Sequence, residues 1–238
     1  GQTNNKIKDL IPPGVLSAMT RLVLTNAIYF KGTWQWEFDT SDTRSEDFKI
    51  TADNTAKVPM MNMDPKKASL NYANTEDAQI LELPYRGDKI SMLVILPTKD
   101  LASIENSLTK EKLNEYKSKM KETKLDSISL PKFEFDSKYF MKDTLSALGM
   151  PTAFLANVAD FSGMTDKKDL YISSVIHRAY VKVDEKGTEA AGATAIAITE
   201  SVIMPSNVFR ADHPFVFAIQ DKDTGNILFL GRVIDPTK

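Results

Sequence analysis

The chain has 238 residues, of which 42% are hydrophobic and 26% charged, a balance typical of a folded protein with a sizeable core. Its formal net charge is −2 with both signs interspersed, so neither nucleic acid nor anionic lipid is expected as a partner. No apolar run reaches the roughly 18 residues that a membrane helix needs, so no membrane partner is expected either. Cysteine is absent, which excludes disulfides, thiolate metal sites and a cysteine nucleophile.

The first half of the chain reads mainly as strands. Residues 20–34 are dense in β-branched, leucine and aromatic residues, which predicts a central strand buried on both faces. Residues 48–63 and 70–99 predict further strands broken by turn signals. The second of these contains a hairpin with its turn at Arg86-Gly87-Asp88, which we interpret as a tight turn rather than as an adhesion motif.

Helical periodicity follows and then gives way to strands. Apolar residues recur at three- and four-residue spacing between residues 101 and 124 among alternating charges, which predicts a pair of amphipathic surface helices. Residues 127–140 return to strand periodicity, and 141–150 predict a short helix closed by Gly149. Residues 169–187 predict a long strand, and 213–234 a second hairpin turned at 223–225. The pattern indicates one mixed, strand-rich α+β domain.

Signatures of catalysis and of metal binding are missing. The two histidines, His177 and His213, have no neighbouring ligand at a spacing useful for zinc, so no metal or other cofactor is expected. Neither a G-x-S-x-G nor an H-E-x-x-H motif occurs, so we expect no enzyme. His177 is best interpreted as a hydrogen-bonded strand histidine, and a hydrolase triad that includes it is the alternative. Residues 187–194 nearly match the phosphate-binding loop motif, but Ala193 occupies the position of its essential lysine, so no nucleotide site is expected.

The segment from Ala190 to Thr199 has neither charge nor proline. These are the two features that normally keep an exposed segment from pairing with a sheet edge, so the segment is permitted to become a strand. An ordinary core strand, an alanine-rich helix capped at Thr188 and a flexible linker remain as alternatives, and periodicity alone does not decide among them.

The stretch VDEKGTEAAGA, residues 183–193, resembles the proximal hinge of the reactive-centre loop in serpins. Further motifs resemble serpin segments in the family's order: TNAIYFKGTW, KVPMM, ILELPY, MLVILP, LPKFEFD, DFSGM, HRAYVKVDEKGTEA and FRADHPFVFAIQDKDTGNILFLGRVIDP. The resemblance implies a single serpin domain over residues 1–238, with mixed sheets, surface helices and a reactive-centre loop at about 187–208. It also implies that the N-terminal helical part of the fold is not in this sequence, so an N-terminal segment of the same serpin is expected as a partner that completes the core.

Serpins inhibit serine proteases, and sometimes cysteine proteases, as suicide substrates: the cleaved loop inserts into the main sheet while the protease stays acyl-linked. By motif match, the hinge that permits insertion comprises Gly187, Thr188, Glu189, Ala190, Ala191, Gly192 and Ala193. The resemblance places a shutter hydrogen bond at Asn26 and His177, and a breach cluster that gates loop entry at Trp34, Lys132 and Glu185.

The scissile bond is predicted by counting along the loop. Counting forward from Gly187 gives Ser201-Val202, which we favour, and counting backward from residue 209 gives Ile203-Met204 as the alternative. Either choice favours elastase-, subtilisin- or chymotrypsin-like targets over trypsin-like ones. The alternative function is that of a non-inhibitory serpin, a ligand carrier or chaperone. We expect an extracellular or secreted protein, with the cytoplasm as the alternative.

Overall fold

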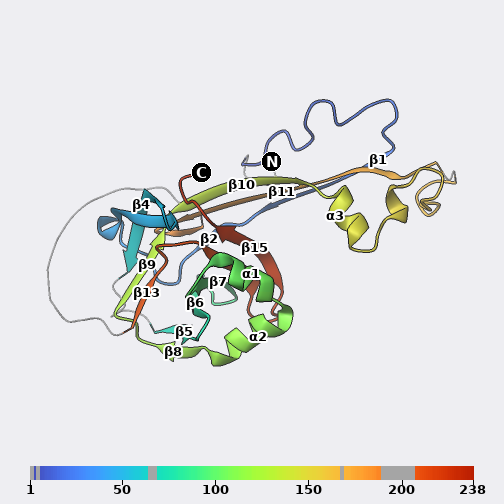
Figure 1. Ribbon diagram of the computed structural model, residues 1–238. Coiled ribbons are helices and arrows are strands. Elements are labelled where there is room, and N and C mark those ends of the chain that lie inside the picture. The colour runs from blue at the N-terminus through green and yellow to red at the C-terminus, as the bar shows by residue number, and fades with distance from the viewer. Residues whose placement is uncertain (1–2, 4–5, 64–68, 167–168, 189–206) are drawn as a thin grey trace. The chain divides into compact units, whose positions relative to one another are not determined.

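The computed structural model describes the whole chain except residues 1–2, 4–5, 64–68, 167–168 and 189–206 (Figure 1). The chain divides into two compact units. The first comprises residues 1–30 and 135–181, and the second residues 31–134 and 182–238. Two long strands, β10 (Phe133–Phe140) and β11 (Ile172–Asp184), contribute residues to both units.

The first unit is built around parallel strands. β1 (Leu22–Tyr29) pairs in parallel with β11, from Leu22 opposite Ile172 to Tyr29 opposite Tyr180, and β10 pairs with β11 as well. Figure 1 shows these three strands running side by side, with the short helix α3 (Lys142–Ala147) following β10. A 3-10 turn, η3, lies at Thr152–Phe154.

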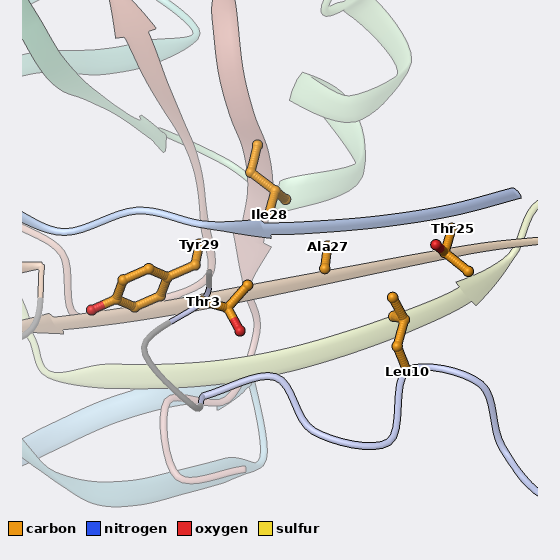
Figure 2. A pocket seen from close by; sticks show the side chains of 6 residues that line it. All are labelled: Thr3, Leu10, Thr25, Ala27, Ile28 and Tyr29. Atoms are coloured by element: carbon orange, nitrogen blue, oxygen red, sulfur yellow. The ribbon is translucent and has the colours of Figure 1, made fainter. Parts of the chain in front are cut away.

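The prediction that β1 is buried on both faces is wrong for this chain. The four central residues of the strand, 24–27, are exposed, and Leu24 retains 41% of its accessible surface. The reason is that the described residues of this unit supply no layer that covers both faces of the strand. A cavity of about 340 Å³ separates the N-terminal segment from β1 (Figure 2); it is lined by Thr3, Leu10, Thr25, Ala27, Ile28 and Tyr29.

The second unit contains two larger sheets. One has four strands in the order β13-β9-β4-β3, and the other six in the order β15-β14-β7-β6-β5-β8. The bounds are β3 (Arg44–Thr51), β4 (Asn54–Met63), β5 (Leu70–Asn74), β6 (Ala78–Pro84), β7 (Ile90–Pro97), β8 (Lys121–Thr123), β9 (Ser127–Pro131), β13 (Val208–Arg210), β14 (Phe215–Asp221) and β15 (Ile227–Val233). A 3-10 turn, η1, lies at Thr40–Asp42, and two-residue strands occur at β2 (Gly32–Thr33) and β12 (Gly187–Thr188).

The predicted pair of amphipathic helices is confirmed as α1 (Leu101–Ser107) and α2 (Lys110–Lys119). Both helices bury apolar side chains against the six-stranded sheet, in a cluster of Ala73, Ala78, Ile80, Ile95, Ile104, Tyr116 and Val216. The hydroxyl of Tyr116 donates to Asp77 at 2.7 Å, so the one polar atom of this buried ring is satisfied. No helix within the described ranges is long and apolar enough to cross a membrane.

The predicted hairpin turn at residues 86–88 is confirmed. Gly87 and Asp88 have φ angles of +91° and +56°, the left-handed conformations that a tight turn requires. The side chain of Arg86 pairs with Glu37 at 2.6 Å, and that of Asp88 with Lys222 at 2.5 Å. Both charged side chains of the tripeptide are therefore engaged within the fold, which supports a turn over an adhesion motif.

Candidate functional site

The site forms where β11 turns back on itself at the start of the predicted hinge. β11 ends at Asp184, and after a turn at residues 185–186 the chain re-enters the sheet as β12. β12 pairs antiparallel with the end of β11, Thr188 opposite Val183, and on its other side antiparallel with β2, Thr188 opposite Gly32. Gly187 and Thr188, the first two predicted hinge residues, therefore lie between two strands of the second unit.

Gly187 is required by close packing of backbone against backbone. Its φ angle is +144°, and a Cβ atom built on it would lie 2.0 Å from the carbonyl oxygen of Gly32. Residues with a side chain rarely adopt this φ, and the obstacle is backbone that cannot rotate away. The approach of β12 to β2 therefore depends on glycine at this position.

Thr188 is held in the interior by Tyr85. The threonine is 1% exposed, and its hydroxyl lies 2.8 Å from the phenolic oxygen of Tyr85, which is itself buried. Burial raises the pKa of the Tyr85 phenol well above its usual range and outweighs the opposing effect of the bond to Thr188. The phenol therefore stays neutral, and either hydroxyl can donate in this buried bond.

The predicted breach residues come together at the same turn. Lys132 Nζ lies 3.1 and 2.9 Å from the two carboxylate oxygens of Glu185, and the hydroxyl of Thr43 donates to Oε1 at 2.8 Å. Burial opposes ionisation of Glu185, but the hydrogen bonds from Lys132 and Thr43 outweigh it, so the pKa of its carboxyl is lowered. The ion pair of Lys132 with Glu185 is thus charged and hydrogen-bonded at neutral pH.

Trp34, the third predicted breach residue, fixes the turn through both polar and apolar contacts. Its indole Nε1 donates to the carbonyl of Asp184 at 3.0 Å, and its backbone nitrogen donates to the carbonyl of Lys186 at 2.8 Å. The buried indole ring stacks on Tyr85 with centroids 4.5 Å apart and an interplanar angle of 14°. Trp34 therefore links the turn directly to the ring that holds Thr188.

Two residues of this site, Tyr85 and Thr43, were not predicted as site residues. Tyr85 ends the quoted motif ILELPY, but its partner Thr188 lies 103 residues away along the chain. Thr43 and its partner Glu185 are 142 residues apart. No local pattern signals contacts at such separations.

The predicted shutter pair lies in the first unit, on neighbouring strands. Asn26 of β1 stands directly opposite His177 of β11, and His177 Nδ1 lies 3.0 Å from Asn26 Oδ1. The ring of Tyr139 stacks on the imidazole with centroids 6.3 Å apart. This contact across neighbouring strands is the one expected of a hydrogen-bonded strand histidine.

The rest of the predicted site lies outside the described residues. This applies to the hinge residues Glu189, Ala190, Ala191, Gly192 and Ala193, and to both candidate bonds, Ser201-Val202 and Ile203-Met204. The described chain resumes before β13, which pairs in parallel with β9. No group of three potential metal ligands occurs in the described part of the chain.

The chain belongs to the serpin family, because a family model described as "Serpin (serine protease inhibitor)" matches residues 1–236. Leukocyte elastase inhibitor A of Rattus norvegicus is 41% identical over 243 residues, a match that covers 99% of this chain and 64% of that protein. Among solved structures, uncleaved ovalbumin matches with a TM-score of 0.86 and 32% identity, covering 99% of this chain and 60% of its own. Thyroxine-binding globulin in complex with thyroxine matches with a TM-score of 0.86 and 30% identity, covering 100% and 62%.

These matches confirm the predicted α+β serpin fold with mixed sheets. The chain spans less than two thirds of the length of each of these three relatives.

Proposed function

We propose that this chain is the C-terminal part, within a single serpin domain, of a serine protease inhibitor that acts as a suicide substrate. The observation that carries the proposal is the position of β12. Gly187 and Thr188 already pair with strands on both sides, and the sequence that follows, from Ala190 to Thr199, carries no charge or proline that would oppose extension of this strand. Extension requires the parallel pairs of β1 with β11 to separate.

The chemistry belongs to the protease. Its active-site serine, or in some targets cysteine, attacks the carbonyl carbon of Ser201, and the peptide bond to Val202 breaks. The new amino group of Val202 takes up the proton, and residues 1–201 stay linked to the protease as an acyl-enzyme. Insertion of the freed loop then carries the protease away from its catalytic geometry before water attacks the ester. The inhibitor is consumed and is no enzyme.

Small and apolar residues around the bond favour elastase-, subtilisin- or chymotrypsin-like targets. Ser201 and Val202 fit a shallow specificity pocket, whereas the alternative bond, Ile203-Met204, offers a larger apolar residue. The naming of a 41% identical relative as a leukocyte elastase inhibitor supports this class. We place the protein outside the cell, where such proteases act, with the cytoplasm as the alternative.

A second partner is an N-terminal segment of the same serpin. The exposed central residues of β1 and the cavity beside them support this proposal, because a strand of Leu, Val, Ile and Tyr gains stability only when its faces are covered. Buried apolar surface contributes about 25 cal/mol per Å², so covering such a strand stabilises the fold substantially.

The proposal is tested by challenging the intact protein with an elastase-like protease. We expect a covalent complex that survives SDS, and a released peptide that begins at Val202 by mass spectrometry. Trypsin serves as the control protease and is expected to give less complex. A peptide that begins at Met204 would assign the scissile bond to Ile203-Met204 instead. Complete cleavage without any complex would contradict suicide inhibition.

A matched variant ties the result to the hinge. Thr188→Arg places a charge in a site that is 1% exposed, and an unpaired buried charge costs several kcal/mol. We expect this variant to be cleaved as a substrate with little complex, whereas Thr165→Arg, in the other unit, inhibits like the original protein. Undiminished complex with Thr188→Arg would refute the role of the hinge.

A ligand carrier is the second candidate, favoured by the structural similarity to thyroxine-binding globulin in complex with thyroxine. A carrier needs no strand insertion, so its loop has no need of small, uncharged residues. The alanine and glycine residues at 190–193 therefore favour the inhibitor over the carrier.

A further inference from the structure

His213 lies at the corner between β13 and β14, and both of its ring nitrogens face oxygen atoms. Nδ1 is 2.9 Å from Oδ1 of Asp212, and Nε2 is 2.9 Å from the carbonyl oxygen of Pro97, the last residue of β7. A carboxylate and a backbone carbonyl only accept hydrogen bonds. Both contacts are therefore hydrogen bonds only when the imidazole carries a proton on each nitrogen, which makes it a cation.

The charges around His213 favour the cation. Asp212 lies on one side, and its other oxygen, Oδ2, accepts from Arg210 of β13 at 3.3 Å. Arg210 also pairs with Glu46 of β3. Lys49 of β3 is the opposing charge, and its backbone nitrogen donates to the carbonyl of Asp212 at 2.8 Å.

The balance of these groups displaces the titration of His213. The hydrogen bond to Asp212 contributes most to raising the pKa of the imidazole, burial opposes it, and the bond to Pro97 adds to the rise. The side chain is 31% exposed, so the proton can exchange with solvent. Of the two histidines, this one has an acidic partner at its ring, whereas the partner of His177 is an amide.

The corner adds to the contacts that hold β13, which also buries Phe209 and pairs Arg210 with Glu46. Within the described ranges, this strand pairs with β9 at three positions, Val208, Phe209 and Arg210. It is the first strand after residues 189–206, where the predicted scissile bond lies. The corner adds a bond from Ala211 to Ser129 of β9, and through His213 a bond to the end of β7 in the other large sheet.

We propose that His213 is a proton-controlled clasp that fastens the C-terminal end of the reactive-centre loop, at β13, to the end of β7. When the imidazole is protonated it donates to Asp212 and to Pro97. When it loses the proton, one of these contacts becomes two facing lone pairs, and the attraction to Asp212 is lost. β13 then detaches from β9 more readily.

The direction of the pH dependence follows from the raised pKa. A group whose pKa is higher in the folded state stabilises the fold fully below its unfolded value, near 6.5 for histidine, and this contribution disappears as the pH rises through the folded value. The clasp is thus closed in mildly acidic solution and opens on the alkaline side of about pH 6.5.

The test begins with NMR titration of the intact protein. The chain contains two histidines, so His177→Gln leaves His213 as the one imidazole of residues 1–238. We expect His213 to titrate above 6.5 and the hydrogen-exchange protection of the β13 amides to fall about fivefold through the same pH range, the effect of losing one hydrogen bond. A His213 signal that titrates at or below 6.5, or unchanged protection, would overturn the clasp.

Two substitutions separate the proton from the side chain. His213→Lys keeps a positive charge and is expected to protect β13 equally at pH 6 and pH 9. His213→Gln keeps a donor without the charge and is expected to show the weaker protection at both values. If the lysine variant follows the pH dependence of the original protein, another group is responsible. These measurements need no protease, so they stand or fall separately from the proposed inhibition.

Discussion

At the scale of single residues, glycine at position 187 is dictated by backbone geometry. A side chain there meets the carbonyl of Gly32 at 2.0 Å and must adopt a φ of +144°. We expect Gly187→Ala to lower the free energy of unfolding by about 1–3 kcal/mol, as strained backbone positions do. Chemical denaturation measures this, with Gly163→Ala as the control, because a Cβ at Gly163 meets nothing within 4 Å. Equal unfolding of both variants and the original protein would show that β12 tolerates a side chain.

The pair of Glu185 and Lys132 makes a prediction about acid stability. The pKa of Glu185 is lowered in the folded protein, so its contribution to stability is full above the unfolded value, near 4.5, and disappears as the pH falls through the lowered one. In Lys132→Gln, we expect a loss of about 1 kcal/mol at pH 7 that shrinks towards zero in acid, since the glutamate is then protonated in both proteins.

Urea titrations at pH 7 and pH 3 measure that difference. Lys57→Gln is the control, because Lys57 and Asp47 form an exposed pair with side chains 66% and 61% accessible. We expect the control to change stability little at either pH. A Lys132→Gln effect that is the same at both pH values would show that the lysine acts by packing and not by charge.

At the scale of elements, β12 is a strand of two residues, and we expect a buried side-chain hydrogen bond to stabilise it. Two-residue pairing on each side is weak by itself, so the buried bond of Tyr85 with Thr188 is expected to decide whether β12 stays in the sheet. Tyr85→Phe and Thr188→Val each remove one hydroxyl. We expect a double-mutant cycle to give a coupling of about 1 kcal/mol.

Tryptophan fluorescence provides a second measurement of whether the bond between Tyr85 and Thr188 keeps β12 in the sheet. Trp34 stacks on Tyr85, and Trp36 is replaced by Phe so that the signal comes from Trp34 alone. Expulsion of β12 in the two variants is expected to change this signal. A coupling near zero, with unchanged fluorescence, would mean that the hydroxyls do not hold the strand.

Sequence patterns predicted most elements of the fold because the signals are local. The turn at residues 86–88, the helices of residues 101–119 and the long strand β11 all follow from spacing and turn chemistry within a few residues. The burial of β1 was predicted wrongly. A strand rich in Leu, Val and Ile indicates that its faces need to be buried, but the sequence of the strand does not show which segment buries them. The pairing of β12 with β2 had no local signal, since it depends on the fit of Gly187 against Gly32.

The candidate site was predicted to a similar extent. The resemblance to serpins brought Trp34, Lys132 and Glu185 together correctly, as it did Asn26 and His177. It did not indicate Tyr85 or Thr43, because no motif match named them as site residues and their partners lie too far along the chain for a local pattern. The reactive bond stays a prediction.

At the scale of the whole molecule, we propose that the cleaved loop becomes a new strand between β1 and β11, whose parallel pairs separate to admit it. We expect such insertion to add backbone hydrogen bonds and to bury apolar side chains of the loop, so the cleaved protein is expected to be more stable than the intact one. A ligand carrier or a hydrolase gains nothing comparable from a cut in the loop.

The most direct measurement is therefore the thermal unfolding of the complete serpin before and after a single cut in residues 189–206. We expect the midpoint to rise strongly in the cleaved protein and Thr188→Arg to remove most of the rise. An unchanged or lower midpoint after cleavage at the loop, verified by mass spectrometry, would contradict it.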